Sequence, residues 1–188
     1  MTKSILLVGV GGQGIILTSK ILSRALINEG FDVKMSEVHG MAQRGGSVST
    51  QVRFGKKVYS PIIGKGKADI LVAFEEMEAM RYIEFINPKG TLIVNDYNIH
   101  SAPIFRGAFK YPDEIIEELS EKVKTIPINA AEEALKIGNI RVQNIILLGK
   151  LAKLLDLKKA DWNELLENNI KKKFVDLNLK AFKIGFEY

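Results

Sequence analysis

A short apolar segment that runs directly into a cluster of glycines is the feature that most constrains the fold of this chain. Residues Ile5–Val10 read ILLVGV, and they overlap the run Gly9-Val-Gly-Gly-Gln-Gly14. A continuous apolar run of this length is typical of a strand buried on both faces of a parallel sheet. Apolar residues then recur at helical spacing from Ile15 to Glu29, and Gly30 ends that pattern. The sequence therefore predicts a buried strand, a tight glycine turn and a packed helix.

Strand-like and helix-like patterns alternate along the rest of the chain, which predicts an α/β fold. The expected strands are Phe31–Val38, Ser47–Phe54, Asp69–Phe74, Thr91–Asn95 and Val123–Ile128, and the expected helices are Glu75–Ile86, 112–122 and Ala130–Ile137. From Val142 onward the apolar spacing is helical, so we expect a helical C-terminal third. A length of 188 residues fits a single domain, 1–188. We expect a three-layer, Rossmann-like domain with a mostly parallel sheet.

Two segments depart from this alternation. Residues 47–54 alternate between apolar and polar side chains, and the turn Gly55-Lys-Lys57 then leads to Val58-Tyr-Ser60. This pattern predicts an antiparallel hairpin around residues 47–60. Residues Asn98–Tyr111, which include a proline and a glycine, have no regular period and are expected to be irregular.

Composition excludes several kinds of site. The chain has no cysteine, so it cannot hold a disulfide, a cysteine nucleophile, a zinc–thiolate site or a cysteine-bound iron–sulfur cluster. Only His39 and His100 are present, so we expect no metal site. The net charge of +5 suits an acidic partner or a phosphorylated ligand, but no nucleic-acid recognition motif accompanies it. No apolar run reaches the ~18 residues of a membrane span. The first residues lead straight into a strand rather than a secretory signal, so we expect a cytoplasmic protein.

The glycine turn matches G-x-G-x-x-G, a pattern that opens dinucleotide-binding units. Glycines allow the backbone to approach a ligand closely, and the helix that follows offers unpaired N–H groups to an anion. A dinucleotide unit also needs an acidic residue where its second strand ends. Asp32 stands at the start of that strand, and Glu37 comes later than is usual. Three interpretations remain open: a bound dinucleotide, another phosphate or diphosphate, or a tight crossing that needs glycines and binds nothing.

A second segment, which combines acidic, imidazole, amide and guanidinium side chains with glycines, follows the second predicted strand. It reads Ser36-Glu-Val-His-Gly-Met-Ala-Gln-Arg-Gly-Gly-Ser47. The carboxyl ends of parallel strands share one edge of the sheet, so this loop and the glycine turn are expected to converge there. Arg44 can pair with a carboxylate or phosphate, and His39 can move a proton near neutral pH. A solvated surface loop with glycine turns is the competing interpretation.

No complete catalytic set is visible. There is no G-x-S-x-G motif, and Gln13-Gly14-Ile15 stands where a phosphate-binding loop needs Gly-Lys-Ser/Thr. The remaining polar clusters have structural interpretations. Glu75-Glu76 begin a helix, where the dipole favours acids. Gln143 and Asn144 suit buried polar contacts at an interface, and Lys171–Lys173 suit a solvated helix end. We therefore expect a binding or assembling subunit rather than a complete catalyst.

The two loops together resemble a known family. The run Gly9–Gly14 before an apolar helix, followed by the run Ser36–Val48, is similar to the gamma-type subunit of 2-oxoacid:ferredoxin oxidoreductases. Within that family the second run is most similar to the small (beta) subunits of the indolepyruvate enzymes. The similarity is strongest in the first half of the chain. The longer, second motif is the more specific of the two.

The resemblance implies a role within an oxidative decarboxylation of a 2-oxoacid, with indolepyruvate or another aryl pyruvate as substrate. It implies that thiamine diphosphate and iron–sulfur clusters lie on a larger partner subunit, that ferredoxin receives the electrons through the complex, and that coenzyme A takes the acyl group. This chain alone is then expected to bind no cofactor, nucleic acid or membrane. The positions that match are Gly11, Gly12, Gln13, Gly14, Glu37, His39, Gln43, Arg44, Gly45 and Gly46.

Among these positions, the resemblance makes His39 and Arg44 the candidates for a catalytic role and the others candidates for ligand or partner binding. Arg44 is expected to contact the substrate carboxylate or a coenzyme A phosphate. The alternative function is an autonomous Rossmann-type nucleotide-binding module. Self-association of the isolated chain into a homodimer is expected if its partner-facing surface is left uncovered.

Overall fold

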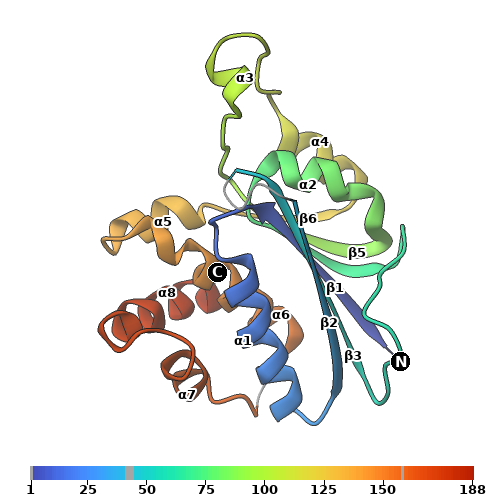
Figure 1. Ribbon diagram of the computed structural model, residues 1–188, viewed down its shortest axis with the longest axis vertical. Coiled ribbons are helices and arrows are strands. Elements are labelled where there is room, and N and C mark those ends of the chain that lie inside the picture. The colour runs from blue at the N-terminus through green and yellow to red at the C-terminus, as the bar shows by residue number, and fades with distance from the viewer. Residues whose placement is uncertain (1, 41–44, 158) are drawn as a thin grey trace.

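The computed structural model describes residues 2–40, 45–157 and 159–188, and the described residues form one six-stranded sheet flanked by helices (Figure 1). The strands are β1 (Lys3–Val10), β2 (Asp32–His39), β3 (Ser47–Gly55), β4 (Ala68–Ala73), β5 (Ile86–Asn95) and β6 (Lys124–Ile128). The longer helices are α1 (Ile15–Asn28), α4 (Ile115–Lys122), α6 (Gln143–Leu155) and α8 (Val175–Glu187). The shorter ones are α2 (Glu76–Tyr82), α3 (Ala102–Phe105), α5 (Ala130–Lys136) and α7 (Trp162–Glu167), with 3-10 turns η1 (Ile83–Phe85), η2 (Ile140–Val142) and η3 (Lys172–Phe174).

The strand order is β2-β3-β1-β4-β5-β6. The pairs β1/β4, β4/β5 and β5/β6 are parallel, whereas β3 is antiparallel to both β1 and β2. Because β3 is antiparallel to both of its neighbours, β2 and β1 run in the same direction. Five strands therefore end at the same edge of the sheet, and the loops that follow them meet there. The expectation of a mostly parallel α/β sheet is confirmed.

The antiparallel element expected around residues 47–60 is present, with different partners. β3 pairs with β2, where Asp32 lies opposite Gly55, and with β1, where Lys3 lies opposite Phe54. Residues 58–60 form no strand, so the predicted returning arm at Val58–Ser60 is wrong. The physical reason is that β3 finds two long partners on either side, which satisfy its backbone hydrogen bonds more completely than a three-residue arm would.

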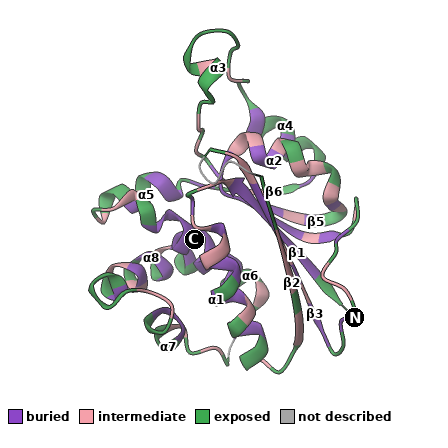
Figure 2. Cartoon of the chain, viewed as in Figure 1, coloured by how far each residue is buried: buried purple, intermediate pink, exposed green. Residues whose placement is uncertain are grey.

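Alternating side chains of the central strands pack into two separate hydrophobic cores, because successive residues of a strand point to opposite faces. On β1, Ile5 and Leu7 pack with α1, α5, α6, α7 and α8, whereas Leu6 and Val8 pack with α2 and α4. Both faces of the sheet are therefore covered, which gives three layers and leaves the central strands buried (Figure 2). The helical C-terminal third is confirmed.

Two helices cross at unusually close range. A Cβ atom on Gly185 of α8 would lie 1.8 Å from the carbonyl oxygen of Ile146, and one on Gly149 of α6 would lie 2.2 Å from the carbonyl oxygen of Phe182. Only glycine fits at either position, so the sequence encodes this crossing directly. The contact fixes α8 against α6, and with it the segment that approaches the glycine turn.

Some element boundaries differ from those predicted. The helix expected over Glu75–Ile86 ends at Tyr82 and continues as η1. β5 begins at Ile86 rather than Thr91, with a shift of register against β4 between Ala68 and Ile70. The predicted turn at residues 87–90 is thus absorbed into an irregular start of β5. Within residues 2–40, 45–157 and 159–188, no helix is long and apolar enough to cross a bilayer.

Candidate functional site

The glycine turn follows β1 and opens the N-terminus of α1. Gly12 and Gly14 have φ values of 105° and 82°, in the left-handed region that glycine tolerates. Gly14 is the N-cap of α1, with no side-chain cap and no acidic residue in the first turn. The first N–H groups of a 14-residue helix therefore face outward without a side-chain acceptor, an arrangement that favours an anion.

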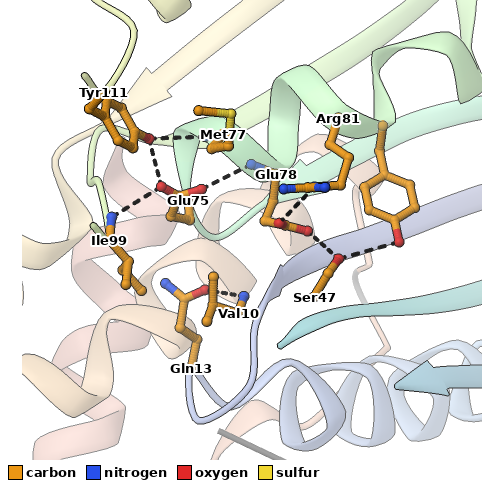
Figure 3. Close-up of polar contacts among 10 residues, drawn as sticks. Val10, Gln13, Ser47, Glu75, Met77, Glu78, Arg81, Ile99 and Tyr111 are labelled. Atoms are coloured by element: carbon orange, nitrogen blue, oxygen red, sulfur yellow. Dashed lines mark hydrogen bonds and ion pairs between the residues drawn. The ribbon is translucent and has the colours of Figure 1, made fainter. Parts of the chain in front are cut away.

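The side chain of Gln13 braces the glycine turn. Gln13 is 9% exposed, and its Oε1 accepts a hydrogen bond from the Val10 amide at 2.7 Å (Figure 3). Its Nε2 donates to the Phe74 carbonyl at 2.8 Å. Both polar atoms of the Gln13 side chain are thus engaged in bracing the turn against the end of β4. Gln13 also lines a cleft beside the turn, so the binding role expected for it stays a prediction.

A second buried amide extends this brace across the sheet. Asn95, at the end of β5, donates to the Phe74 carbonyl at 3.2 Å and to Oε1 of Gln143 at 2.8 Å. Its Oδ1 accepts from the Ala130 amide at 3.1 Å. Gln143 was expected to make a buried polar contact, and it does so inside the domain. The ends of β1, β4 and β5 and the starts of α5 and α6 are therefore linked by one network of hydrogen bonds.

The loop after β2 meets the glycine turn, as the shared edge predicts. The Gly11 amide donates to the Gly46 carbonyl at 2.8 Å, and the Gly45 amide donates to the Gly11 carbonyl at 3.4 Å. His39 is exposed and lines a cavity of about 410 Å³ together with Gly11, Gly12, Gly14 and the first residues of α1. These direct backbone contacts make one composite edge from two segments that are distant in sequence.

The other residues considered for the site lie in β2 or outside the described residues. Glu37 is half-buried in β2, two residues before His39, and so on the same face of the strand. Gln43 and Arg44 lie outside the described residues. Asp32, considered as a ribose ligand, sits at the opposite end of β2, where it accepts from the Val58 amide at 2.8 Å and pairs with Lys34 at 3.2 Å. It is therefore remote from the glycine turn.

A basic cleft lies on the other side of the same turn. Its volume is about 330 Å³, and its lining combines Gly12 and Gly14 with Arg141 of η2 and Lys171 beside η3. Sequence reasoning missed Arg141 and took Lys171 as part of a solvated helix end. Neither has a local motif, because they are brought to the turn by the packing of α6 and α8. The two cations and the open end of α1 make this cleft suited to a phosphate.

A buried acidic group lies on the third side, where α2 begins. Glu75 is 1% exposed and caps α2 by accepting from the Glu78 amide at 2.9 Å, which confirms the helix-start interpretation (Figure 3). Glu78 accepts from Ser47, the first residue of β3, and pairs with Arg81 at 3.1 Å. Tyr111 donates its hydroxyl to Glu75 at 2.6 Å. These contacts tie α2 to β3 and to the segment before α4.

Burial and neighbouring charge shift the titration of this group. Partial burial, together with the negative charges of Asp96 and Glu75, raises the pKa of Glu76 to about 7. Burial also raises the pKa of Glu78, although its contacts with Ser47 and Arg81 act in the opposite direction. Burial and the adjacent Glu75 raise the pKa of the Tyr111 hydroxyl. The described residues contain no cluster of His, Cys, Asp or Glu able to hold a metal ion.

Comparison with known proteins gives a consistent result. The family model described as pyruvate ferredoxin/flavodoxin oxidoreductase matches residues 4–188. The chain is 42% identical over 191 aligned residues to the indolepyruvate oxidoreductase subunit IorB of Archaeoglobus fulgidus, covering 99% of this chain and 94% of that protein. It is 40% identical to IorB of Methanothermobacter thermautotrophicus, covering 99% and 97%.

Its fold also resembles a solved structure. The gamma subunit of a keto/oxoacid ferredoxin oxidoreductase from Geobacter sulfurreducens superposes with a TM-score of 0.75 at 25% identity, covering 100% of this chain and 95% of that one. The similarity therefore extends over nearly the full length of both chains and supports a shared fold.

Proposed function

The chain belongs to the pyruvate ferredoxin/flavodoxin oxidoreductase family, and we propose that it is the small subunit of an indolepyruvate:ferredoxin oxidoreductase complex. The observation that carries this proposal is the similarity to two archaeal IorB subunits over nearly the full length of both chains. The proposed reaction is the oxidative decarboxylation of indolepyruvate or another aryl pyruvate. It yields an acyl-coenzyme A and passes two electrons to ferredoxin.

The cofactors of that reaction do not fit this chain. Iron–sulfur clusters are held mainly by cysteine thiolates, and the sequence has none. The described residues also lack an acidic or histidine cluster for the metal ion that accompanies a diphosphate cofactor. We therefore assign thiamine diphosphate and the clusters to a larger partner subunit, and ferredoxin contact to the complex as a whole.

The part that this chain plays is to bind and orient. Its glycine-turn edge presents the open end of α1, His39 on one side and the pair Arg141 and Lys171 on the other. We assign the basic cleft to a phosphate group of coenzyme A, because two cations beside an uncapped helix N-terminus stabilise a bound dianion. We also assign Arg44 to an anion of the substrate or of coenzyme A. Gln13 and Asn95 hold the edge in shape through their hydrogen bonds.

The test is reconstitution of the complex. This chain and its larger subunit would be expressed together without oxygen, purified, and assayed for reduction of ferredoxin or a viologen dye with a panel of 2-oxoacids and coenzyme A. We expect co-elution with iron and thiamine diphosphate, and the highest kcat/KM with indolepyruvate. Omission of this chain should abolish the activity. Recovery of a lone chain that NAD or another nucleotide stabilises strongly would instead favour an autonomous nucleotide-binding module.

A further inference from the structure

An arm of residues 99–111 projects from the edge of the sheet that carries the candidate site. It leaves after β5, contains α3 and returns before α4, standing clear of the rest of the chain (Figure 1). Along it, residues 100–103 and 105–110 are all exposed, including Phe105 at 84% and Phe109 at 69% (Figure 2). Two phenylalanine rings at the tip of a projecting arm gain nothing from the domain's own core, and a partner surface is what would bury them.

A buried carboxyl group contacts both ends of the base of the arm, and the Met77 amide donates to the Tyr111 hydroxyl at 3.2 Å. Oε1 of Glu75 accepts from the Ile99 amide at 3.1 Å and from the Tyr111 hydroxyl at 2.6 Å, so one oxygen holds both ends of the arm (Figure 3). The rings of His100 and Tyr111 also lie together, with centroids 5.3 Å apart. A buried carboxyl group is costly unless it is fully hydrogen-bonded, and here its bonds set where the arm emerges.

The tip is ordered by its own backbone. The Phe105 amide donates to the Ser101 carbonyl, and the Arg106 and Gly107 amides donate to the carbonyls of Ala102 and Ile104, at 2.9–3.0 Å. An arm that is already folded loses less conformational entropy on binding than a disordered one, so its exposed rings are pre-organised for a partner.

The chemistry of the tip defines its complement. Between residues 97 and 111 the sequence contains Arg106 and Lys110 and no acidic residue. Aromatic rings flanked by arginine are typical of residues that dominate protein–protein affinity. The surface that fits this arm therefore has apolar pockets for two rings and carboxylates around them.

A second copy of this chain presents an apolar cavity of the wrong charge for this arm. Its large apolar cavity, about 730 Å³ between α7 and α8, is bordered by Lys180 and Lys183 and by one acid, Asp156. Two lysines beside the pocket would repel the cations of the arm. The base of the arm, in contrast, shares a cavity of about 470 Å³ with Val10 and Gly45 of the candidate site. A partner that meets the glycine-turn edge therefore also meets the arm.

We propose that the arm of residues 99–111 is the element that docks this chain onto the larger, thiamine-bearing subunit, with Phe105 and Phe109 filling apolar pockets and Arg106 and Lys110 facing carboxylates. This inference rests on the proposed function, which supplies the partner. Glu75 is a positioning residue in it, because it holds both ends of the arm.

The test compares binding of the reconstituted larger subunit to three forms of this chain. The double variant Phe105→Ser with Phe109→Ser removes both rings from exposed positions, so the fold is retained. Tyr59→Ser is the matched control, since Tyr59 has the same exposure of 84% and follows β3, whose last residue pairs at the far end of the sheet. We expect the double variant to raise the Kd for the larger subunit on the order of 100-fold and the control to leave it unchanged. Thermal unfolding should be unaltered in both.

Charge and partner are tested in the same assay. Association of the wild-type chain should slow as salt is added, and the variant Arg106→Glu with Lys110→Glu should lose that dependence. If the wild-type chain and the double variant bind the larger subunit equally, the arm proposal is overturned while the proposed function stands. If the wild-type chain does not bind the larger subunit, the proposed function is refuted and the larger subunit is excluded as the partner of the arm. A wild-type homodimer that the double variant abolishes would assign the arm to a second copy and overturn the proposal.

Discussion

Gln13 distinguishes a brace from a ligand contact, and replacing it tests the architecture of the whole edge. The variant Gln13→Met keeps the size of the side chain but removes two hydrogen bonds, one from the Val10 amide at 2.7 Å and one to the Phe74 carbonyl at 2.8 Å. The Phe74 carbonyl keeps its bond from Asn95, but the Val10 amide loses its acceptor. A lost bond is worth about 1 kcal/mol, and an orphaned donor costs about 1–3 kcal/mol.

The expected loss of unfolding free energy is therefore about 2–4 kcal/mol. With a urea m-value of about 2 kcal/mol/M, the unfolding midpoint should fall by roughly 1–2 M. The control is Lys20→Met, which places the same side chain at an exposed position of α1 and should change stability by less than about 0.5 kcal/mol. An unchanged midpoint for Gln13→Met, together with a higher KM for coenzyme A in the complex, would refute the brace and support a binding role for Gln13.

Three further changes probe the crossing of α6 with α8, the acidic group and the basic cleft. Gly185→Ala should lower the unfolding free energy by about 1–3 kcal/mol, since its Cβ would lie 1.8 Å from a backbone oxygen, and a gain of about 1 kcal/mol from helix propensity cannot offset that. A stability equal to wild type in urea would contradict the close crossing. Glu76 has a pKa raised to about 7, so its ionisation costs stability as pH rises from its ordinary value near 4.5 to above 7. Glu76→Gln should therefore unfold at higher temperature than wild type at pH 8 and at the same temperature below about pH 4.5; a gap that widens in acid would reverse the assigned sign. Arg141→Glu with Lys171→Glu should raise the KM for coenzyme A at least tenfold with little change in the KM for the 2-oxoacid, whereas Lys89→Glu should change neither. Equal effects on both substrates would remove the phosphate assignment.

Local patterns were sufficient for the first strand, the glycine turn and α1. The run Ile5–Val10 has one stable arrangement, a strand covered on both faces, and the glycines at 12 and 14 adopt positive φ as a tight turn requires. The convergence of that turn with the loop after β2 also followed from sequence, since parallel strands end at one edge. The interpretation of Glu75 as a helix-start residue was right but incomplete, because its second role depends on Tyr111, 36 positions away.

The alternation of strands and helices, the lack of cysteine and the two glycine-containing runs predict an α/β subunit without cysteine-bound clusters, because these are properties of composition and of local spacing. Other features follow from contacts across the fold. These are the place of β3 between β1 and β2, the hydrogen bonds of Gln13, the basic cleft of Arg141 and Lys171, and the contact of the arm with Glu75. Such contacts join residues tens of positions apart through the packing of several elements at once. No periodic pattern in the sequence records which of the available partners each polar group meets, so only folding of the entire chain selects them.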